Sequence, residues 1–198
     1  TGRLKFRFDE VNHILKTKTC STPVVVYNAF SCAWASDVPT ALVDLFADSA
    51  LPPFLAASLR DLVARYPDEL SGLGHWDLRS LQHVSERSPN LVRAIGYLLV
   101  ESFETSTDIV GDGWAYARMR RLASRSLPHP LLSFDRDTPE MRGRTVVLTP
   151  AGEAVLKGDA NFIRLNGLVD DIGGVSLNYP SEPTWVRSGS MLLFRDRV

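Results

Sequence analysis

Arginines recur at helical spacing in one short segment, and they are the strongest chemical signal in the chain. The pattern over 113–126 predicts a helix, and four large side chains fall on it at i, i+4, i+7 and i+11: Trp114, Arg118, Arg121 and Arg125. Residues at these intervals share one face of a helix. A guanidinium group binds phosphate oxygens and pairs bidentately with guanine, so this face is a candidate nucleic-acid contact. An apolar stripe faces the other way: Tyr116, Met119, Leu122 and Ala123.

A polar loop that follows this helix holds further arginines. Extended runs at 131–134 and 145–148 flank the loop 135–144, and a helix opens at Thr149, whose hydroxyl can cap it before Pro150. Helix, strand, loop, strand and helix is the order of a winged-helix unit, whose recognition helix enters the major groove of DNA. The loop would then be the wing, with three phosphate contacts: Arg136, Arg142 and Arg144.

The same arginines have a simpler explanation, because an exposed helix face often pairs with nearby acids. Four acids are available: Asp112, Asp135, Asp137 and Glu140. Many winged helices also bind proteins or join domains. The leading hypothesis is therefore a non-enzymatic interaction or regulatory module that contacts a protein partner or an absent N-terminal domain through an apolar patch around Trp114. Double-stranded DNA, bound through Arg118, Arg121 and Arg125, is the alternative partner.

Catalytic groups form no recognised pattern. Four acids gather beside a Gly-Asp-Gly turn: Glu101, Glu104, Asp108 and Asp112. Paired carboxylates can hold a metal or transfer protons, but turn and capping roles are commoner, and Asp112 is well placed to cap the central helix. The four histidines are scattered, and no zinc-protease, P-loop or dinucleotide-binding motif occurs. We therefore expect no catalytic residue, cofactor or metal. A second alternative, the accessory half of an enzyme, predicts a pocket where the Asp108–Asp112 loop meets Asp170-Asp171.

Composition is that of an ordinary globular protein. The 198 residues are 44% hydrophobic and 23% charged, and the formal net charge is -1, which does not suggest a strongly basic nucleic-acid binder. No apolar run approaches the roughly 18 residues of a membrane span, and no signal peptide is visible, so we expect a cytoplasmic protein that does not enter a membrane. Cys20 and Cys32 are too few for a disulfide scaffold, and we expect buried, reduced thiols.

The elements that position these residues are mostly helices. Periodicity predicts helices over 9–16, 23–35, 39–47, 51–66, 76–85, 89–103, 113–126 and 160–165, and further strands over 175–178 and 191–194. Ser88-Pro89 is expected to open the helix 89–103, and Gly96 within it to mark a close helix contact. The expected fold is mainly α with a small β component. An N-terminal helical region, 1–70, precedes a winged-helix-like region, 71–198, and both share one core.

Three stretches, in chain order, resemble one bacterial protein family. They are ALPPFLAASLRDLVARYP (50–67), GDGWAYARMRRLA (111–123) and LTPAGEAVLKGDANFIRLNGLVDDIGGVSL (148–177). Together they resemble the C-terminal half of an uncharacterised family of the domain-of-unknown-function 1835 type, whose ending reads like LNGIDRWLGGVHL. The resemblance covers roughly residues 9–177 and implies a helix over 23–35.

The other half of that family carries an NGDS-like motif and an acidic aromatic motif, and neither occurs here. The resemblance therefore implies a fragment, or a member that lacks that half. Within the ending, Val-Asp-Asp at 169–171 replaces an acidic-basic-aromatic triplet, and Ser176 replaces a histidine. The family has no established activity, so the resemblance assigns no catalytic residue.

Overall fold

Helices make up roughly half of the described residues, and three short antiparallel strand pairs supply the β component. The computed structural model describes residues 30–47, 53–87, 89–136, 138 and 140–198. Residues 30–35 are helical, and the named helices follow: α3 (Thr40–Ala47), α4 (Pro53–Val63), α5 (His75–Glu86), α6 (Leu91–Thr105), α7 (Asp112–Leu122), α8 (Pro150–Lys157) and α9 (Phe162–Asn166). The expected class, mainly helical with a small β component, agrees with this content.

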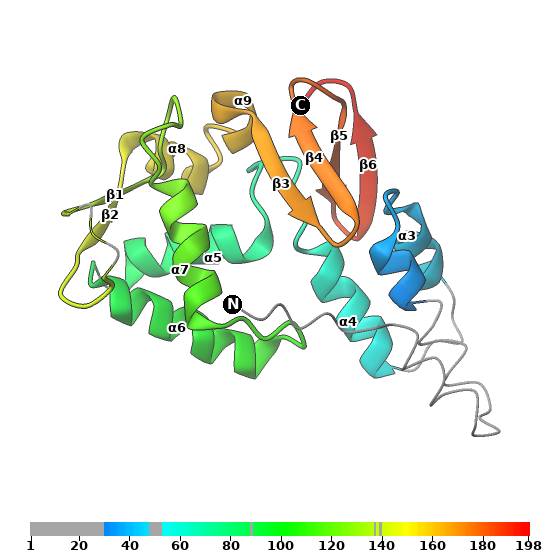
Figure 1. Cartoon of the computed structure of the whole chain (residues 1–198), viewed down its shortest axis with the longest axis horizontal. Coiled ribbons are helices and arrows are strands. Elements are labelled where there is room, and N and C mark those ends of the chain that lie inside the picture. The colour runs from blue at the N-terminus through cyan, green and yellow to red at the C-terminus, as the bar shows by residue number, and fades with distance from the viewer. Residues whose placement is uncertain (1–29, 48–52, 88, 137, 139) are drawn as a thin grey trace, which may run out of the picture.

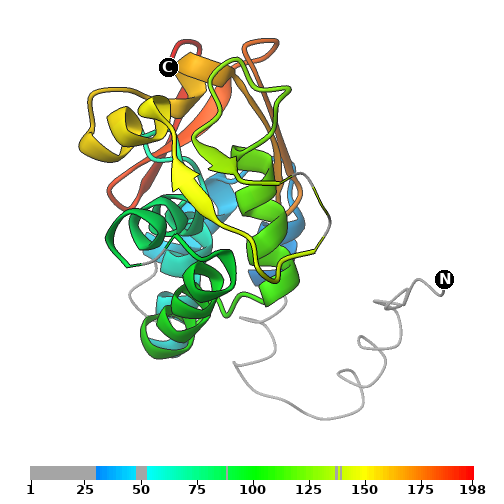
Figure 2. The same cartoon turned by 90° about the vertical axis from the view of Figure 1, so that its left-hand side faces the viewer.

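Helices α5, α6 and α7 pack together, and a hairpin lies beside them (Figure 1). The hairpin consists of β1 (Leu132–Phe134) and β2 (Val146–Leu148), paired with Leu132 opposite Leu148. Between α5 and α6 the chain is extended at Asn90, which forms an antiparallel bridge with Thr145 just before β2. The hairpin is thus joined both to the chain after α7 and to the α5–α6 connection. Figure 2 shows it from its own side, in front of these helices.

Two further hairpins lie on the other side of α7. The first pairs β3 (Leu168–Ile172) with β4 (Val175–Tyr179), and the second pairs β5 (Thr184–Ser188) with β6 (Met191–Arg195). Figure 1 shows them between α7 and α3, with α4 below them. The sequence predicted β4 and β6 but missed β3 and β5. Aspartates disfavour strands, and β3 contains Asp170 and Asp171; it forms because its two ends, Leu168 and Ile172, are buried.

Most buried apolar side chains form one cluster that runs in sequence from Val63 to Leu192. Val63 and Tyr66 belong to it, so the chain before residue 70 packs with the chain beyond it. A smaller cluster joins three residues near the start of the described chain: Ala33, Leu42 and Leu59. Trp34 packs against both clusters, which links the N-terminal helices to the main core.

The N-terminal residues of three helices can be compared with the caps that the sequence predicted. Thr149 caps α8 as expected, because its Oγ1 accepts from the Gly152 N–H at 3.1 Å. The expected opening of α6 at Ser88-Pro89 is wrong, since Asn90 is the cap and its Oδ1 accepts from the Arg93 N–H at 3.0 Å. The expected cap of α7 is also wrong: Gly111 takes that position and Asp112 lies in the first turn. The expected helix 9–16 and residues 23–29 lie outside the described residues.

Two smaller expectations are wrong as well. Cys32 is exposed, because it lies on the outer side of the helical turn whose inward position is taken by buried Ala33. Cys20 lies outside the described residues. A Cβ added to Gly96 would meet nothing within 4 Å, so Gly96 does not mark a close helix contact inside the molecule. Among the described helices, none has the length and apolar character needed to cross a membrane.

Candidate functional site

Helix α7 is the element that brings the predicted site residues together. Its buried side chains, Ala115, Met119 and Leu122, fix it in the main core. Met119 and Leu122 belong to the predicted apolar stripe, whereas Ala115 was not in it and the other two members are partly buried. It lies in front of α5 and α6 in Figure 1, with the β1–β2 hairpin on one side and β3 on the other. The remaining side chains of α7 therefore divide into a row that meets β3 and α5 and a row that meets solvent.

The first row consists of Trp114, Arg118 and Arg121. Arg118 donates from Nε to Asp77 Oδ1 at 2.9 Å and from Nη1 to Asp170 Oδ2 at 2.7 Å. Arg121 Nη1 lies 2.5 Å from the same Asp170 oxygen. Two arginines and two aspartates thus join α5, α7 and β3. The spacing correctly placed these arginines on one face, but the expectation that this face is open to solvent is wrong, because α5 and β3 cover it.

Electrostatics hold this network in its charged form. Burial alone lowers the pKa of Arg118, but the carboxylates of Asp77 and Asp170 outweigh it and raise that pKa above the ordinary arginine value. Burial likewise raises the pKa of Asp170, but Arg118 and Arg121 outweigh it and lower that pKa below the ordinary range. Each charge is therefore stabilised by its partners and not by water. These two arginines are not free to bind a phosphate while the network is intact.

Trp114 is half-buried between two cations. The guanidinium carbons of Arg65 and Arg118 lie 5.6 and 5.7 Å from its ring centroid, within cation–π range. Arg65 Nε in turn donates to Asp108 Oδ2 at 2.7 Å. The ring of Trp114 therefore lies near two charged side chains, and the apolar patch expected around it stays a prediction.

The pocket expected for an enzyme half takes a different form. A cavity of about 50 Å³ lies beside Trp114 and is lined by Asp170 and Asp171, but not by the 108–112 loop. The carboxylate of Asp108 accepts a hydrogen bond from Arg65 and another, at 3.1 Å, from Trp76 Nε1. Its negative charge is therefore already paired within the protein. Within the described residues, no three His, Cys, Asp or Glu side chains are grouped to hold a metal ion.

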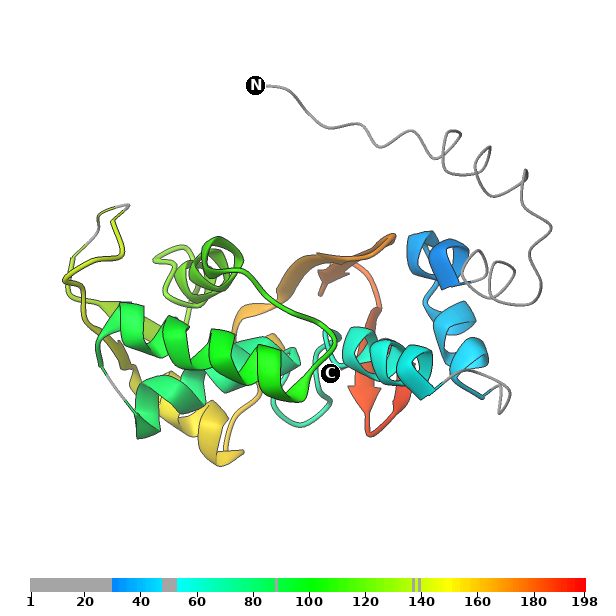
Figure 3. The same cartoon turned by 90° about the horizontal axis from the view of Figure 1, so that it is seen from below.

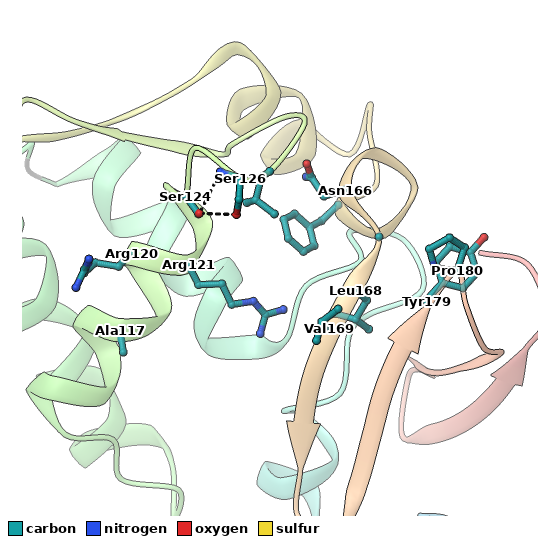
Figure 4. A pocket seen from close by; sticks show the side chains of 13 residues that line it. Ala117, Arg120, Arg121, Ser124, Ser126, Asn166, Leu168, Val169, Tyr179 and Pro180 are labelled. Atoms are coloured by element: carbon teal, nitrogen blue, oxygen red, sulfur yellow. Dashed lines mark hydrogen bonds between the residues drawn. The ribbon is translucent and has the colours of Figure 1, made fainter. Parts of the chain in front are cut away.

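The second row of α7 faces solvent and was missed by the sequence analysis. Ala117 and Arg120 lie on it at i and i+3, and Ser124 follows just after the helix end at Leu122. Arg120 is exposed, with its guanidinium 5.8 Å from the Tyr116 ring centroid. Two hollows flank this row. One, of about 790 Å³, lies toward β3, and the other, of about 470 Å³, lies toward the β1–β2 hairpin. Figure 4 shows Arg121 pointing across the first hollow toward β3, while Arg120 points away from it.

The loop between β1 and β2 also separates its arginines into two kinds. Arg144 is 2% exposed; its Nη1 donates to Thr138 O and to Tyr116 Oη at 2.6 Å, and its guanidinium lies 4.3 Å from the Phe134 ring centroid. The expectation that Arg144 contacts phosphate is wrong, because its charge supports the loop from inside. Arg136 and Arg142 are exposed as expected, and so is Arg125. The expected place of Arg125 on the helix is wrong, because α7 ends at Leu122 and Arg125 follows in the turn beyond it.

Charge around this site differs from that of the whole chain. Residues 111–145 contain seven arginines and four acids, a formal charge of +3 in a chain of net charge -1. No protein-family model matches the chain, and no curated protein or solved structure is significantly similar to it.

Proposed function

We propose that α5, α6, α7 and the β1–β2 hairpin form a winged-helix unit that binds double-stranded DNA. The order of elements supports this assignment: a helix, an extended bridge residue at Asn90, two helices and a hairpin whose second strand continues from the bridge partner, Thr145. In such a unit the third helix, here α7, is the one that enters the major groove, and the hairpin loop is the wing. The binding helix would use Ala117 and Arg120, and Ser124 just after the helix end would lie beside them.

The observation that carries the proposal is the set of unpaired cations around α7. Arg120, Arg125 and Arg142 are exposed, and no carboxylate of the described residues lies within ion-pair distance of them. Figure 3 shows α7 and the described part of the loop projecting to the same side, away from α6 and α8. A single duplex could therefore meet both. Arg118 and Arg121, the arginines expected from the sequence, contribute by holding α7 in place.

The strength of binding follows from the number of phosphate contacts. Each contact lowers the logarithm of the affinity by about 0.9 per tenfold rise in salt concentration. Three or four arginines therefore predict a modest, strongly salt-dependent affinity, of the order of micromolar at low salt. The net charge of -1 on the whole chain is compatible with DNA binding, because the segment 111–145 that would contact DNA is itself positively charged.

The test is a fluorescence-anisotropy titration of a random-sequence duplex at about 50 and about 200 mM salt. Arg120→Ala should weaken binding, and Arg120→Ala/Arg125→Ala should weaken it further and reduce the salt slope by roughly two contacts. Arg60→Ala is the matched control, because Arg60 is an exposed helical arginine on α4 and lies beside the β5–β6 turn, not beside α7. Absence of binding at low salt, or equal loss in the control, would contradict the proposal.

Protein docking at the same surface is the second candidate, and one observation favours it. The larger hollow beside α7 has apolar walls that include Leu127 and Pro180, and Val169 at its edge is 76% exposed. A protein partner that inserts an apolar side chain there would bind with little dependence on salt. Val169→Asn separates the candidates: it should weaken docking of a protein by placing a polar group in the apolar wall, and leave DNA binding within a factor of about two, because it changes no charge.

A further inference from the structure

Helix α6 has an apolar stripe on the side that faces away from the core. Val92, Val100 and Phe103 are 46%, 54% and 68% exposed, and with Gly96 they occupy positions i, i+4, i+8 and i+11. Such spacing places them in one row, about 16 Å long at 1.5 Å per residue. The helix lies nearest the viewer in Figure 3, and none of the described elements crosses in front of it. A continuous row of this kind on a helix indicates an interface.

We propose that this stripe pairs with the stripe of a second copy of the chain, with the two α6 helices antiparallel about a two-fold axis. The axis would cross α6 at the level of Leu98, midway between Gly96 and Val100. It then places Val100 of each copy opposite Gly96 of the other. A Cβ at Gly96 would meet nothing within 4 Å, so the surface there is open and can receive a valine side chain. Small residues allow this close approach of two helices.

Opposite charges at the two ends of the stripe indicate that its partner is a second copy of the chain. Arg93 lies near the first end and Glu104 near the last, both exposed and both on the same flank, 60° and 80° from Gly96 at the 100° turn per residue of an α-helix. A two-fold axis perpendicular to the helix keeps each flank on its own side and exchanges the ends. Arg93 of one copy therefore meets Glu104 of the other, twice in the dimer. Neither has an ion-pair partner among the described residues.

One helix of 15 residues gives a limited contact area. A stable dimer commonly buries about 800 Å² per partner, and the stripe alone supplies less than that. We therefore expect a reversible dimer whose population rises with protein concentration over the micromolar range. The α6 stripe and the α7 row lie on different helices, so the dimer does not depend on the proposed DNA binding.

Sedimentation equilibrium of the full chain over the micromolar range is the test. The wild type should associate to a dimer, and Val100→Asp should be monomeric at every concentration, because it buries an unpaired charge in the interface. Val147→Asp is the matched control, since Val147 is 51% exposed on β2 and should leave the dimer unchanged. Circular dichroism checks that the variants are folded. A wild type that stays monomeric, or a dimer that survives Val100→Asp, would overturn the proposal.

Exchange of the end charges tests the antiparallel arrangement itself. Arg93→Glu and Glu104→Arg should each weaken the dimer several-fold, because like charges then face each other across the axis. The double variant Arg93→Glu/Glu104→Arg should restore the wild-type dissociation constant. Within one chain the two side chains are about 16 Å apart along the helix, so restoration has no intramolecular explanation. Failure of the double variant to recover would overturn the antiparallel arrangement.

Discussion

Arg118 and Arg120 lie two residues apart on α7, and their surroundings are opposite. Arg118 is held by Asp77 and Asp170, and its charge is stabilised inside the protein. Arg120 is exposed beside two solvent-filled hollows. Two residues turn a helix by about 200°, so the two side chains leave it in nearly opposite directions. The chemistry of arginine does not decide whether the side chain is held inside the protein or left exposed; what decides is whether an acid lies opposite.

The loop between β1 and β2 repeats this contrast over two residues. Arg144 points inward and bonds the loop carbonyls, whereas Arg142 is exposed. In both places an inward arginine fixes a segment of the chain, and a nearby arginine on the same segment is exposed. Removal of the inner arginine of a pair should therefore cost more stability than removal of the outer one.

Removal of Arg118 should give the largest effect. Arg118→Ala leaves Asp77, which is 3% exposed, without its partner, and an unpaired buried charge costs about 3 kcal/mol or more. Urea unfolding followed by circular dichroism measures the loss. Arg120→Ala is the matched control on the same helix and should change the free energy of unfolding by about 0.5 kcal/mol or less. Equal losses in the two variants would show that the inner and outer rows do not differ as described.

The positions of most helices could be predicted from the sequence, because each has a local cause. Residues close together in sequence determine the apolar spacing of α4 and α5 and the Thr149-Pro150 start of α8. The shared face of Arg118 and Arg121 was also predictable, since it follows from helix geometry alone. The exposure of Arg136 and Arg142 was predictable from another local cause, because they lie in a polar loop.

The direction in which the shared face points was not predictable, because its cause is distant in sequence. Asp170 lies 52 residues after Arg118, in strand β3. This strand was not predicted, because aspartate has a low strand propensity. Asp77 lies 41 residues before Arg118. No local pattern indicates that both carboxylates converge on one guanidinium. The exposed pair of Ala117 and Arg120 was missed as a result, although the two residues also share one face of the helix.

Removal of Arg144 should give an intermediate effect and test the loop half of the comparison. Arg144→Met keeps much of the volume against Phe134 but removes the donors to Thr138 O and Tyr116 Oη. We expect a loss of about 2 kcal/mol, since the Arg144 Nε already lacks a partner among the described residues and the exposed carbonyls can bind water instead. Arg142→Met should change stability by about 0.5 kcal/mol or less. Thermal unfolding of both variants would show whether the inward arginine is the structural one.

The smallest effect is expected from Asp170, and it depends on pH. Asp170→Asn leaves Arg118 paired with Asp77 and lets the partly exposed Arg121 turn to water, so we expect a loss of about 1 kcal/mol near neutral pH. Arg118 and Arg121 lower the pKa of Asp170 in the folded state, against the effect of burial. A carboxyl with a lowered folded pKa contributes stability that is complete above its unfolded pKa of about 4 and is lost as the pH falls through the folded value.

The difference in unfolding free energy between wild type and Asp170→Asn should therefore be constant from about pH 7 to about pH 5 and shrink below about pH 4. Urea unfolding of both proteins at a series of pH values measures it. Asp171→Asn, next along β3 and exposed, is the control and should not alter the acid side of the profile as strongly. A constant difference down to about pH 2 would mean that Asp170 acts through its hydrogen-bond geometry alone. In that case the inner row of α7 would be held by shape and not by charge.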